Sequence, residues 1–159
     1  MSREVRRVPK DWKHPRNEHG RYIALHEDYK GSVDDWDKGA ALWNSGVYPE
    51  YASEENKKLS YAEWDMQRPE KEDYMPEWKD GEAMHFMMYE TCSEGTPISP
   101  AFETPEELAK WLFENQASAF GSQTASYESW LRVANGGYAC SAIHENGIIK
   151  SGVEGLSDA

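Results

Sequence analysis

Two cysteines and five histidines are the residues of this chain best suited to covalent chemistry. Cys92 follows His85, and Cys140 precedes His144, so either pair would form a thiolate–imidazole site if the fold brought it together. Residues a few positions apart on an extended strand do not make such a contact by themselves. We therefore expect two reduced, partly buried thiols.

Metal and cofactor sites are not indicated by the histidine pattern. His14, His19 and His26 fit neither a zinc knuckle nor a helical i, i+4 pair, and no cysteine is near enough to complete a tetrahedral site. We expect these histidines to lie exposed on the N-terminal segment. The sequence predicts no metal and no cofactor.

Acidic residues are numerous, but their positions do not define an active site. Glu103, Glu106 and Glu107 have a structural role near the start of a predicted helix. A glycosidase-like pair would need a cleft, which the sequence does not locate. The stretch "ANGGYACS" lacks the spacing and the lysine of a phosphate-binding loop. We assign no catalytic residue, and a non-catalytic protein is favoured while an enzyme stays open.

The composition is typical of a soluble, folded protein. A length of 159 residues fits a single domain, and 7 Trp, 9 Tyr and 4 Phe can anchor a core although only 38% of residues are hydrophobic. No apolar run approaches the roughly 20 residues that a membrane span requires. The basic N-terminus is not followed by an apolar stretch, so it is not a signal peptide. We expect a cytoplasmic location.

Charge is distributed unevenly along the chain. Residues 1–30 hold 8 Lys/Arg and 5 Asp/Glu, whereas residues 31–159 hold 9 Lys/Arg and 24 Asp/Glu. An acidic body repels nucleic acid and anionic membranes and attracts basic surfaces. We therefore expect a protein partner with a basic surface, no membrane partner, and no direct contact with nucleic acid.

The N-terminal half is predicted to be irregular around one helix. Residues 1–30 form a basic arm that is interrupted by prolines, with a turn at 17–20 and a short strand at 21–25. A helix over 31–46 would begin at a Ser32 cap. Residues 46–82 are acidic and rich in aromatics, and we expect them to wrap the domain. Ser60 and Glu63 predict a capping box for a helix over 61–67.

The C-terminal half carries clearer secondary-structure signals. Successive side chains of residues 83–92 would point to opposite faces of a strand, and both faces are largely apolar, as in a central strand. Thr104, Pro105 and Glu107 predict a capped helix, and a second helix over 127–134 should end at the following glycines. A hairpin over 138–153 would turn at Asn146–Gly147.

These patterns predict an α+β fold with a small, mostly antiparallel sheet, two or three short helices and an extended N-terminal arm. Residues 31–159 would form a single domain that includes the acidic, aromatic-rich segment at 46–82. The candidate binding residues are acidic, aromatic or hydroxyl side chains from that segment and from the loop before the capped helix: Glu54, Glu55, Trp64, Asp65, Tyr74, Trp78, Thr96 and Ser99.

Several stretches together resemble a group of small uncharacterised proteins from tailed phages and prophages: "REVRRVPKDWKHPRNEHGRYIAL", "YAEWD", "RPEKEDYMPEW", "MYETCSEGTPISPAFETPEELAKWL", "ASAFG", "TASYESWL" and "SGVEGL". The resemblance covers most of the chain and implies a phage accessory protein acting in the bacterial cytoplasm, where inhibitors of host defence are common. No catalytic residue carries over. The family typically has Pro where this chain has Cys140, which argues against Cys140 as a nucleophile.

Three hypotheses for function follow. The first is a phage-encoded, non-catalytic protein that binds a host protein or nucleoprotein through its acidic, aromatic-rich surface. The second is a protein or enzyme that binds a small, nucleotide-type molecule in a pocket near residues 94–104 and 118–126. The third is a minor virion or assembly factor.

Overall fold

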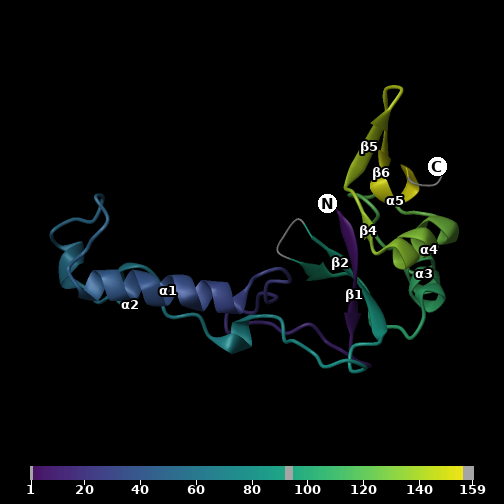
Figure 1. Cartoon of the computed structure of the whole chain (residues 1–159). Helices are drawn as coiled ribbons and strands as arrows, with labels where there is room; N and C mark the ends of the chain where they lie inside the picture. Colours follow the sequence, from purple (N-terminus) through teal and green to yellow (C-terminus); the bar gives the residue numbers. More distant parts are fainter. Residues whose placement is uncertain (1, 92–94, 156–159) are drawn as a thin grey trace. The chain divides into compact units, whose positions relative to one another are not determined.

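A computed structural model describes residues 2–91 and 95–155, which divide into two compact units (Figure 1). Met1–Leu25 and Glu77–Ala159 form one unit, which we call the sheet unit. His26–Pro76 form the other, which we call the inserted unit because it interrupts the first in sequence. The N-terminal segment thus belongs with the C-terminal half of the chain.

The sheet unit contains a four-stranded antiparallel sheet in the order β3-β2-β1-β4. Its strands are β1 (Arg3–Val8), β2 (His85–Glu90), β3 (Thr96–Pro97) and β4 (Tyr138–Ala139). Strand β1 lies between β2 and β4, and its Val5 is paired with Met88. The predicted α+β fold with a mostly antiparallel sheet is confirmed.

The start of the predicted arm is therefore a sheet strand. Its residues are mostly charged, so the sequence pattern did not suggest a strand with neighbours on both sides. Arg3 is buried nonetheless, since its Nε donates to the Ser118 carbonyl oxygen at 2.9 Å. The prediction of a strand over 21–25 was wrong: Tyr22 forms only an isolated bridge with Arg16, because these residues close a turn at Asn17.

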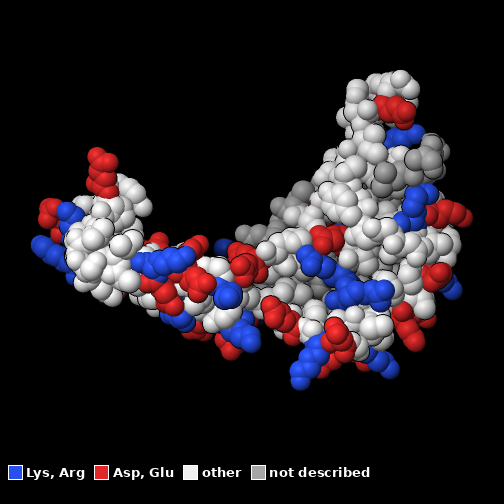
Figure 2. Space-filling model, in the orientation of Figure 1, with Lys and Arg blue, Asp and Glu red and all other residues white. Residues whose placement is uncertain are grey.

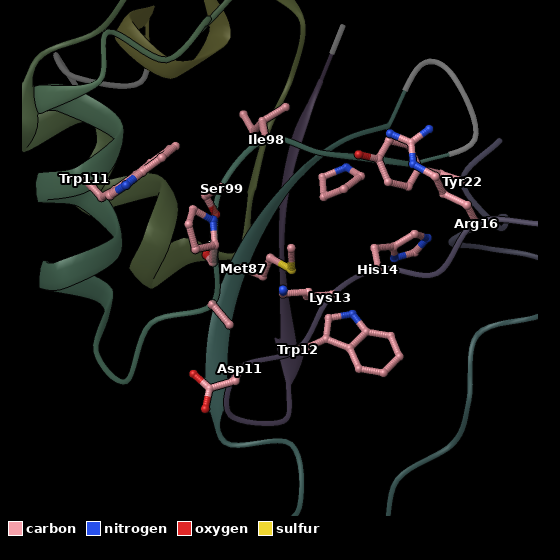
Figure 3. A pocket seen from close by; sticks show the side chains of 13 residues that line it. Asp11, Trp12, Lys13, His14, Arg16, Tyr22, Met87, Ile98, Ser99 and Trp111 are labelled. Atoms are coloured by element: carbon pink, nitrogen blue, oxygen red, sulfur yellow. The ribbon is translucent and has the colours of Figure 1, made fainter. Parts of the chain in front are cut away.

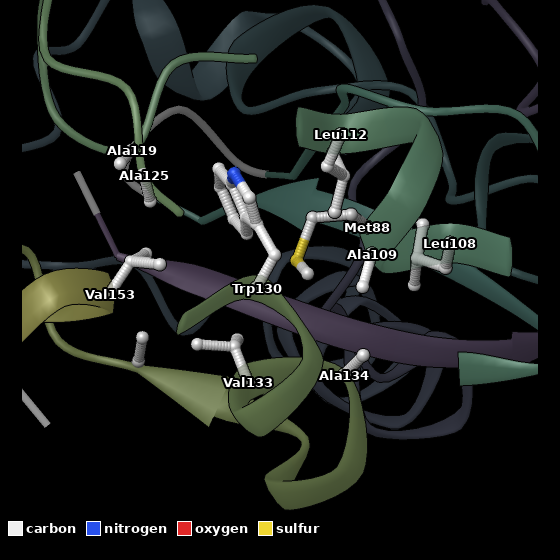
Figure 4. Packing of buried hydrophobic residues seen from close by; sticks show 11 residues of the cluster. Met88, Leu108, Ala109, Leu112, Ala119, Ala125, Trp130, Val133, Ala134 and Val153 are labelled. Carbon is white, nitrogen blue, oxygen red and sulfur yellow. The ribbon is translucent and has the colours of Figure 1, made fainter. Parts of the chain in front are cut away.

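Two helices cover one face of the sheet: α3 (Pro105–Glu114) and α4 (Tyr127–Gly136). Figure 4 shows the Met88 side chain of β2 among residues of both helices, including Leu108, Leu112 and Trp130. All four side chains are fully buried. The core of this unit therefore lies between the helices and the sheet.

The predicted ends of α3 and α4 are confirmed. Thr104 caps α3, with its Oγ1 accepting from the Glu107 N–H at 3.2 Å, and Pro105 is the first helical residue. Helix α4 ends at Gly137, whose φ of 84° is the left-handed conformation that glycine adopts readily. Both ends follow local rules, which is why the sequence located them.

The opposite face of β2 is covered by residues of the N-terminal segment. Met87 and Tyr89 are buried there, as are Ile23 and Leu25. Tyr89 contacts Trp12 and His14 through its hydroxyl group. Strand β2 thus lies between β3 and β1 and is covered on both faces, as its largely apolar side chains predicted.

The C-terminal part forms the hairpin of β5 (Ala142–Glu145) and β6 (Ile148–Ser151), followed by α5 (Gly152–Gly155). The predicted turn at Asn146–Gly147 is confirmed, with φ of 49° and 81°. The hairpin is shorter than predicted, because Tyr138 and Ala139 pair with β1 instead. Glu154 accepts hydrogen bonds from the Ser126 N–H and the Ser129 hydroxyl, which ties α5 to the start of α4.

The inserted unit consists of α1 (Tyr29–Asn44), α2 (Tyr61–Trp64) and the short 3₁₀ helices η1 (Asn56–Lys58) and η2 (Lys71–Asp73). The predicted Ser32 cap was wrong: α1 begins earlier, after Asp28, and the Ser32 N–H already bonds to the Asp28 carbonyl oxygen. The predicted box at Ser60 and Glu63 is confirmed, although α2 is shorter than the predicted helix.

The described part of the chain contains no helix with the length and apolarity needed to cross a membrane.

Candidate functional site

The inserted unit is built around a cluster of aromatic rings next to α1. Trp43 is buried and stacks on Trp64, with ring centroids 4.3 Å apart and an interplanar angle of 23°. Tyr48 packs edge-on against Trp43 at 4.7 Å, and the Trp43 indole N–H donates to the Leu59 carbonyl oxygen at 3.0 Å. The aromatic rings of Tyr48, Tyr61 and Trp64 are therefore gathered around Trp43.

A glycine in α1 allows this cluster to approach the helix. A Cβ atom on Gly39 would lie 2.1 Å from the hydroxyl oxygen of Tyr61, whose ring also packs near Trp36 and Trp43. An interior glycine costs a helix about 1 kcal/mol relative to alanine. Close approach of Tyr61 is the structural reason for it here.

The outer side of this cluster is an open apolar groove. Its volume is about 360 Å³, and Trp64 and Asp65 lie in its lining. Three further lining residues are large and apolar but exposed: Leu42 (53%), Val47 (55%) and Tyr51 (81%). Tyr51 extends the stack, with its ring 6.1 Å from that of Trp64. We call this surface the aromatic groove.

The aromatic groove belongs to the more acidic unit. Residues 26–76 carry 13 Asp/Glu and 6 Lys/Arg, whereas the larger sheet unit carries 16 and 11. Figure 2 shows many acidic side chains along α1, interspersed with Lys and Arg. The groove therefore combines apolar rings with surroundings of negative net charge.

The structure places the candidate residues of this unit in different surroundings. Trp64 and Asp65 line the aromatic groove, whereas Glu54 and Glu55 are exposed just before η1 and do not line it. Glu54 forms an ion pair with Lys57 at 2.6 Å. Tyr74 packs against Tyr29 and lines a separate hollow of about 630 Å³, which Asp65 also lines.

The remaining candidates lie in the sheet unit. Trp78 packs edge-on against Trp12 at 4.9 Å, and Thr96 pairs with Glu90 in the sheet. Ser99 is buried: its hydroxyl accepts from the Met88 N–H and donates to a neighbouring carbonyl oxygen. Of these three, Ser99 lines a pocket of the sheet unit, and Trp78 and Thr96 do not.

That pocket has a volume of about 640 Å³ and lies over β2 (Figure 3). The N-terminal segment contributes residues 11–14, Arg16 and Tyr22, and the facing side is formed by residues 97–101 and Trp111. We call it the arm pocket. Residues 97–101 belong to the first stretch of the pocket expected from the sequence, but residues 118–126 of the second stretch do not line it. Ala119 and Ala125 are instead part of the hydrophobic core.

His14 connects the wall of the arm pocket to the sheet. Its Nε2 lies 2.8 Å from the Ile23 carbonyl oxygen, which can only accept, so Nε2 carries the proton. Its Nδ1 accepts from the Tyr89 hydroxyl at 3.1 Å. Burial lowers the pKa of His14 below the ordinary histidine value, and burial raises the pKa of Tyr89 to about 12. Both groups are neutral near pH 7.

This role of the arm was not predicted from the sequence. His14 was predicted to be exposed, which was wrong, since only 7% of its surface is accessible. Lys13, Arg16 and Tyr22 were not chosen as site residues. The signal that could have found them was the alternation of basic and aromatic residues in "DWKHPRNEHGRY".

The cysteine and metal hypotheses receive no structural support in the described residues. The Cys140 sulfur lies 3.9 Å from the Ala142 carbonyl oxygen. Cys92 lies outside the described residues. Across residues 2–91 and 95–155, no group of three or more His, Cys, Asp or Glu side chains is arranged to hold a metal ion.

Comparisons of the chain with protein-family models, curated protein sequences and solved structures found no match.

Proposed function

We propose that this chain is a non-catalytic binding protein that engages a basic protein surface through the aromatic groove. The observation that carries the proposal is an open groove of stacked rings, with exposed Leu42, Val47 and Tyr51, on an acidic unit. Tyrosine and tryptophan anchors in a partly formed pocket are typical of the energetic centre of protein interfaces.

Exposed apolar surface is concentrated in the inserted unit. Ten large hydrophobic side chains are exposed in the described parts of the chain, and five of them lie in this unit, which holds about a third of the residues. Besides the three in the groove, these are Leu59 and Met66. Water contact with so many apolar side chains is unfavourable, so their covering by a partner would contribute to binding.

Charge and ring chemistry both favour a basic partner. The acidic unit would speed encounter with positive surfaces and disfavour negative ones. A lysine or arginine of the partner can lay its apolar stem in the groove and place its charge over the face of Tyr51 or Trp64. Asp65, in the groove lining, would pair with that charge.

The origin of the partner is part of the proposal and is supported by the sequence resemblance alone. If the chain is carried by a tailed phage or prophage, its partner is a protein or nucleoprotein of the bacterial host. Inhibition of a host defence protein would be consistent with such a binding mode.

The experiment is an affinity capture from bacterial lysate with two matched charge-reversal variants. One variant changes Glu54, Glu55 and Asp65 to Lys; the control changes Glu103, Glu114 and Glu145, which are exposed on the sheet unit. We expect one basic protein to be retained by the wild type and the control but lost with the first variant. Tyr51→Ser should also weaken retention, and retention should fall as salt increases.

Two results would contradict the proposal. The first is a capture that recovers no specific protein. The second is equal loss of the captured protein with both triple variants, since a general charge effect would then replace a defined surface.

A further inference from the structure

The arm pocket has the size and walls of a small-molecule site. Its volume of about 640 Å³ lies within the roughly 300–1,000 Å³ usual for ligand pockets. Figure 3 shows Trp12, Tyr22 and Trp111 around its rim and Met87 at the surface of β2. Flat aromatic and apolar walls suit a ligand that contains a planar ring system.

The pocket is held in shape by contacts that do not need a ligand. Trp12 donates its indole N–H to the Tyr89 hydroxyl at 3.3 Å and packs edge-on against Trp78. Tyr22 packs edge-on against His14 at 5.7 Å. Tyr89 belongs to the sheet, so these rings are fixed to a rigid element, and binding would cost little ordering entropy.

The charged groups of the pocket favour an anion. Its ionic lining residues are Asp11, Lys13 and Arg16, whereas His14 is neutral near pH 7. The Arg16 guanidinium stacks 3.8 Å above the Tyr22 ring and donates to the Gly20 carbonyl oxygen. The Lys13 ammonium makes no ion pair or hydrogen bond with any residue among 2–91 and 95–155, and Figure 3 shows its chain among the pocket residues.

The pocket lining has two cationic side chains and one anionic side chain, in a chain of net charge −12. A free ammonium in a hollow with an already stacked guanidinium attracts a phosphate or carboxylate, and charge-assisted hydrogen bonds are the stronger ones. The neutral form of His14 keeps its two ring nitrogens occupied by Tyr89 and Ile23, so it does not compete for the anion.

We propose that the arm pocket binds a planar aromatic anion of about nucleotide size, with its ring against the aromatic walls and its anionic group at Lys13 and Arg16. A volume of about 640 Å³ leaves room for more than a single ring. This site is separate from the aromatic groove, because it is formed entirely by residues of the sheet unit.

The test measures binding to the full chain by calorimetry with four probes. Adenosine monophosphate and indole-3-acetate each combine a planar ring with an anion, as phosphate and carboxylate respectively. Adenosine has the ring without the charge, and inorganic pyrophosphate has the charge without the ring. We expect saturable binding of at least one ring-bearing anion, and binding about 10-fold weaker or worse for the two partial probes. The anion that binds more tightly shows whether the pocket prefers a phosphate or a carboxylate group.

The matched variants are Lys13→Gln and Lys10→Gln. Both lysines are exposed in the same segment, but only Lys13 lines the pocket. Lys13 has no ionic partner to lose in the described structure, so its variant should fold normally. We expect Lys13→Gln to weaken binding of the anion about 10-fold and Lys10→Gln to leave it unchanged.

Several results would overturn the proposal. One is the absence of saturable binding of either ring-bearing anion at concentrations up to about 10 mM. If adenosine bound as tightly as the two ring-bearing anions, the negative charge would play no part in recognition. If pyrophosphate bound as tightly, the ring would play no part. Equal effects of Lys13→Gln and Lys10→Gln would show that the anion lies elsewhere.

Discussion

His14 determines how the N-terminal segment is attached to the sheet. It bonds to Ile23 in its own segment and to Tyr89, which is 75 residues away in the sequence. Its burial lowers its pKa, because the charged form would lose hydration. Protonation would also force Nδ1 to donate, whereas it now accepts from the Tyr89 hydroxyl. The neutral form is therefore the one that fits.

The free energy of unfolding should depend on pH through His14. In the unfolded chain His14 has the ordinary histidine pKa of about 6.5, and in the folded chain its pKa is lower. The burial of neutral His14 therefore contributes its full stabilisation above about pH 6.5. This stabilisation should fall as the pH decreases below about 6.5, by at most about 1.4 kcal/mol per pH unit. Urea unfolding at about pH 7.5 and about pH 5.5 measures this. The difference should shrink in His14→Gln and persist in His19→Gln, an exposed control; equal differences in both would contradict it.

Gly95 is a second residue on which the N-terminal segment depends. Its φ is 101°, and a Cβ atom there would lie 2.3 Å from the Cβ of Leu25. Gly95→Ala should lower the free energy of unfolding by about 2 kcal/mol or more, since both backbone strain and overpacking are added. Gly20→Ala is the control, because Gly20 also has positive φ but open space around it. Thermal unfolding would contradict this explanation if the two variants lost equal stability.

At the scale of elements, α3 shows how one helix separates a buried face from an exposed one. Its Thr104–Glu107 capping box sets where the helix begins, and this decides which side chains point to the core. Leu108 and Leu112 are fully buried, whereas Phe113 is 51% exposed. Neighbouring positions on the helix therefore contribute very differently to stability.

Leu112→Ala should lower the free energy of unfolding by about 2–5 kcal/mol, because it removes buried contacts and leaves a cavity. Phe113→Ala removes a larger side chain but one in contact with water, and its effect should stay below about 1 kcal/mol. Chemical denaturation compares the two directly. A larger loss for Phe113→Ala would mean that α3 presents another face to the core.

At the scale of the whole molecule, the chain has two units with separate interiors. The sheet, the core between the sheet and α3 and α4, and the arm pocket use residues of the sheet unit only. The aromatic cluster around Trp43 uses residues of the inserted unit only. Each proposed binding site thus belongs to one unit.

Replacing residues 26–76 by a flexible Gly/Ser linker should leave the sheet unit folded. The shortened chain should show one cooperative thermal transition and dispersed amide resonances, because all of its core contacts remain. It should lose capture of the basic protein and keep binding of the aromatic anion. Non-cooperative unfolding would show that the sheet unit depends on the inserted unit.

The sequence alone determined the features of this protein that depend on neighbouring residues. The start of α3, the closing glycine of α4 and the turn at Asn146–Gly147 follow from hydrogen bonds within a few positions. The sequence of β2 also predicted a central strand, because successive side chains point to opposite faces and both sets of positions are largely apolar. For the candidate site, the sequence identified Trp64 and Asp65, which line the aromatic groove, and Ser99, which lines the arm pocket.

Only the tertiary structure decided which distant segments meet. Arg3 is buried because it reaches Ser118, which is 115 residues away, and no local pattern encodes that contact. The arm pocket likewise requires the N-terminal segment to face residues 97–101 across β2. A basic, proline-interrupted segment looks solvated in sequence, but hydrogen bonds to Tyr89 and burial of Ile23 make its attachment to the sheet favourable. Long-range pairing of this kind is a property of the folded chain and not of any short stretch within it.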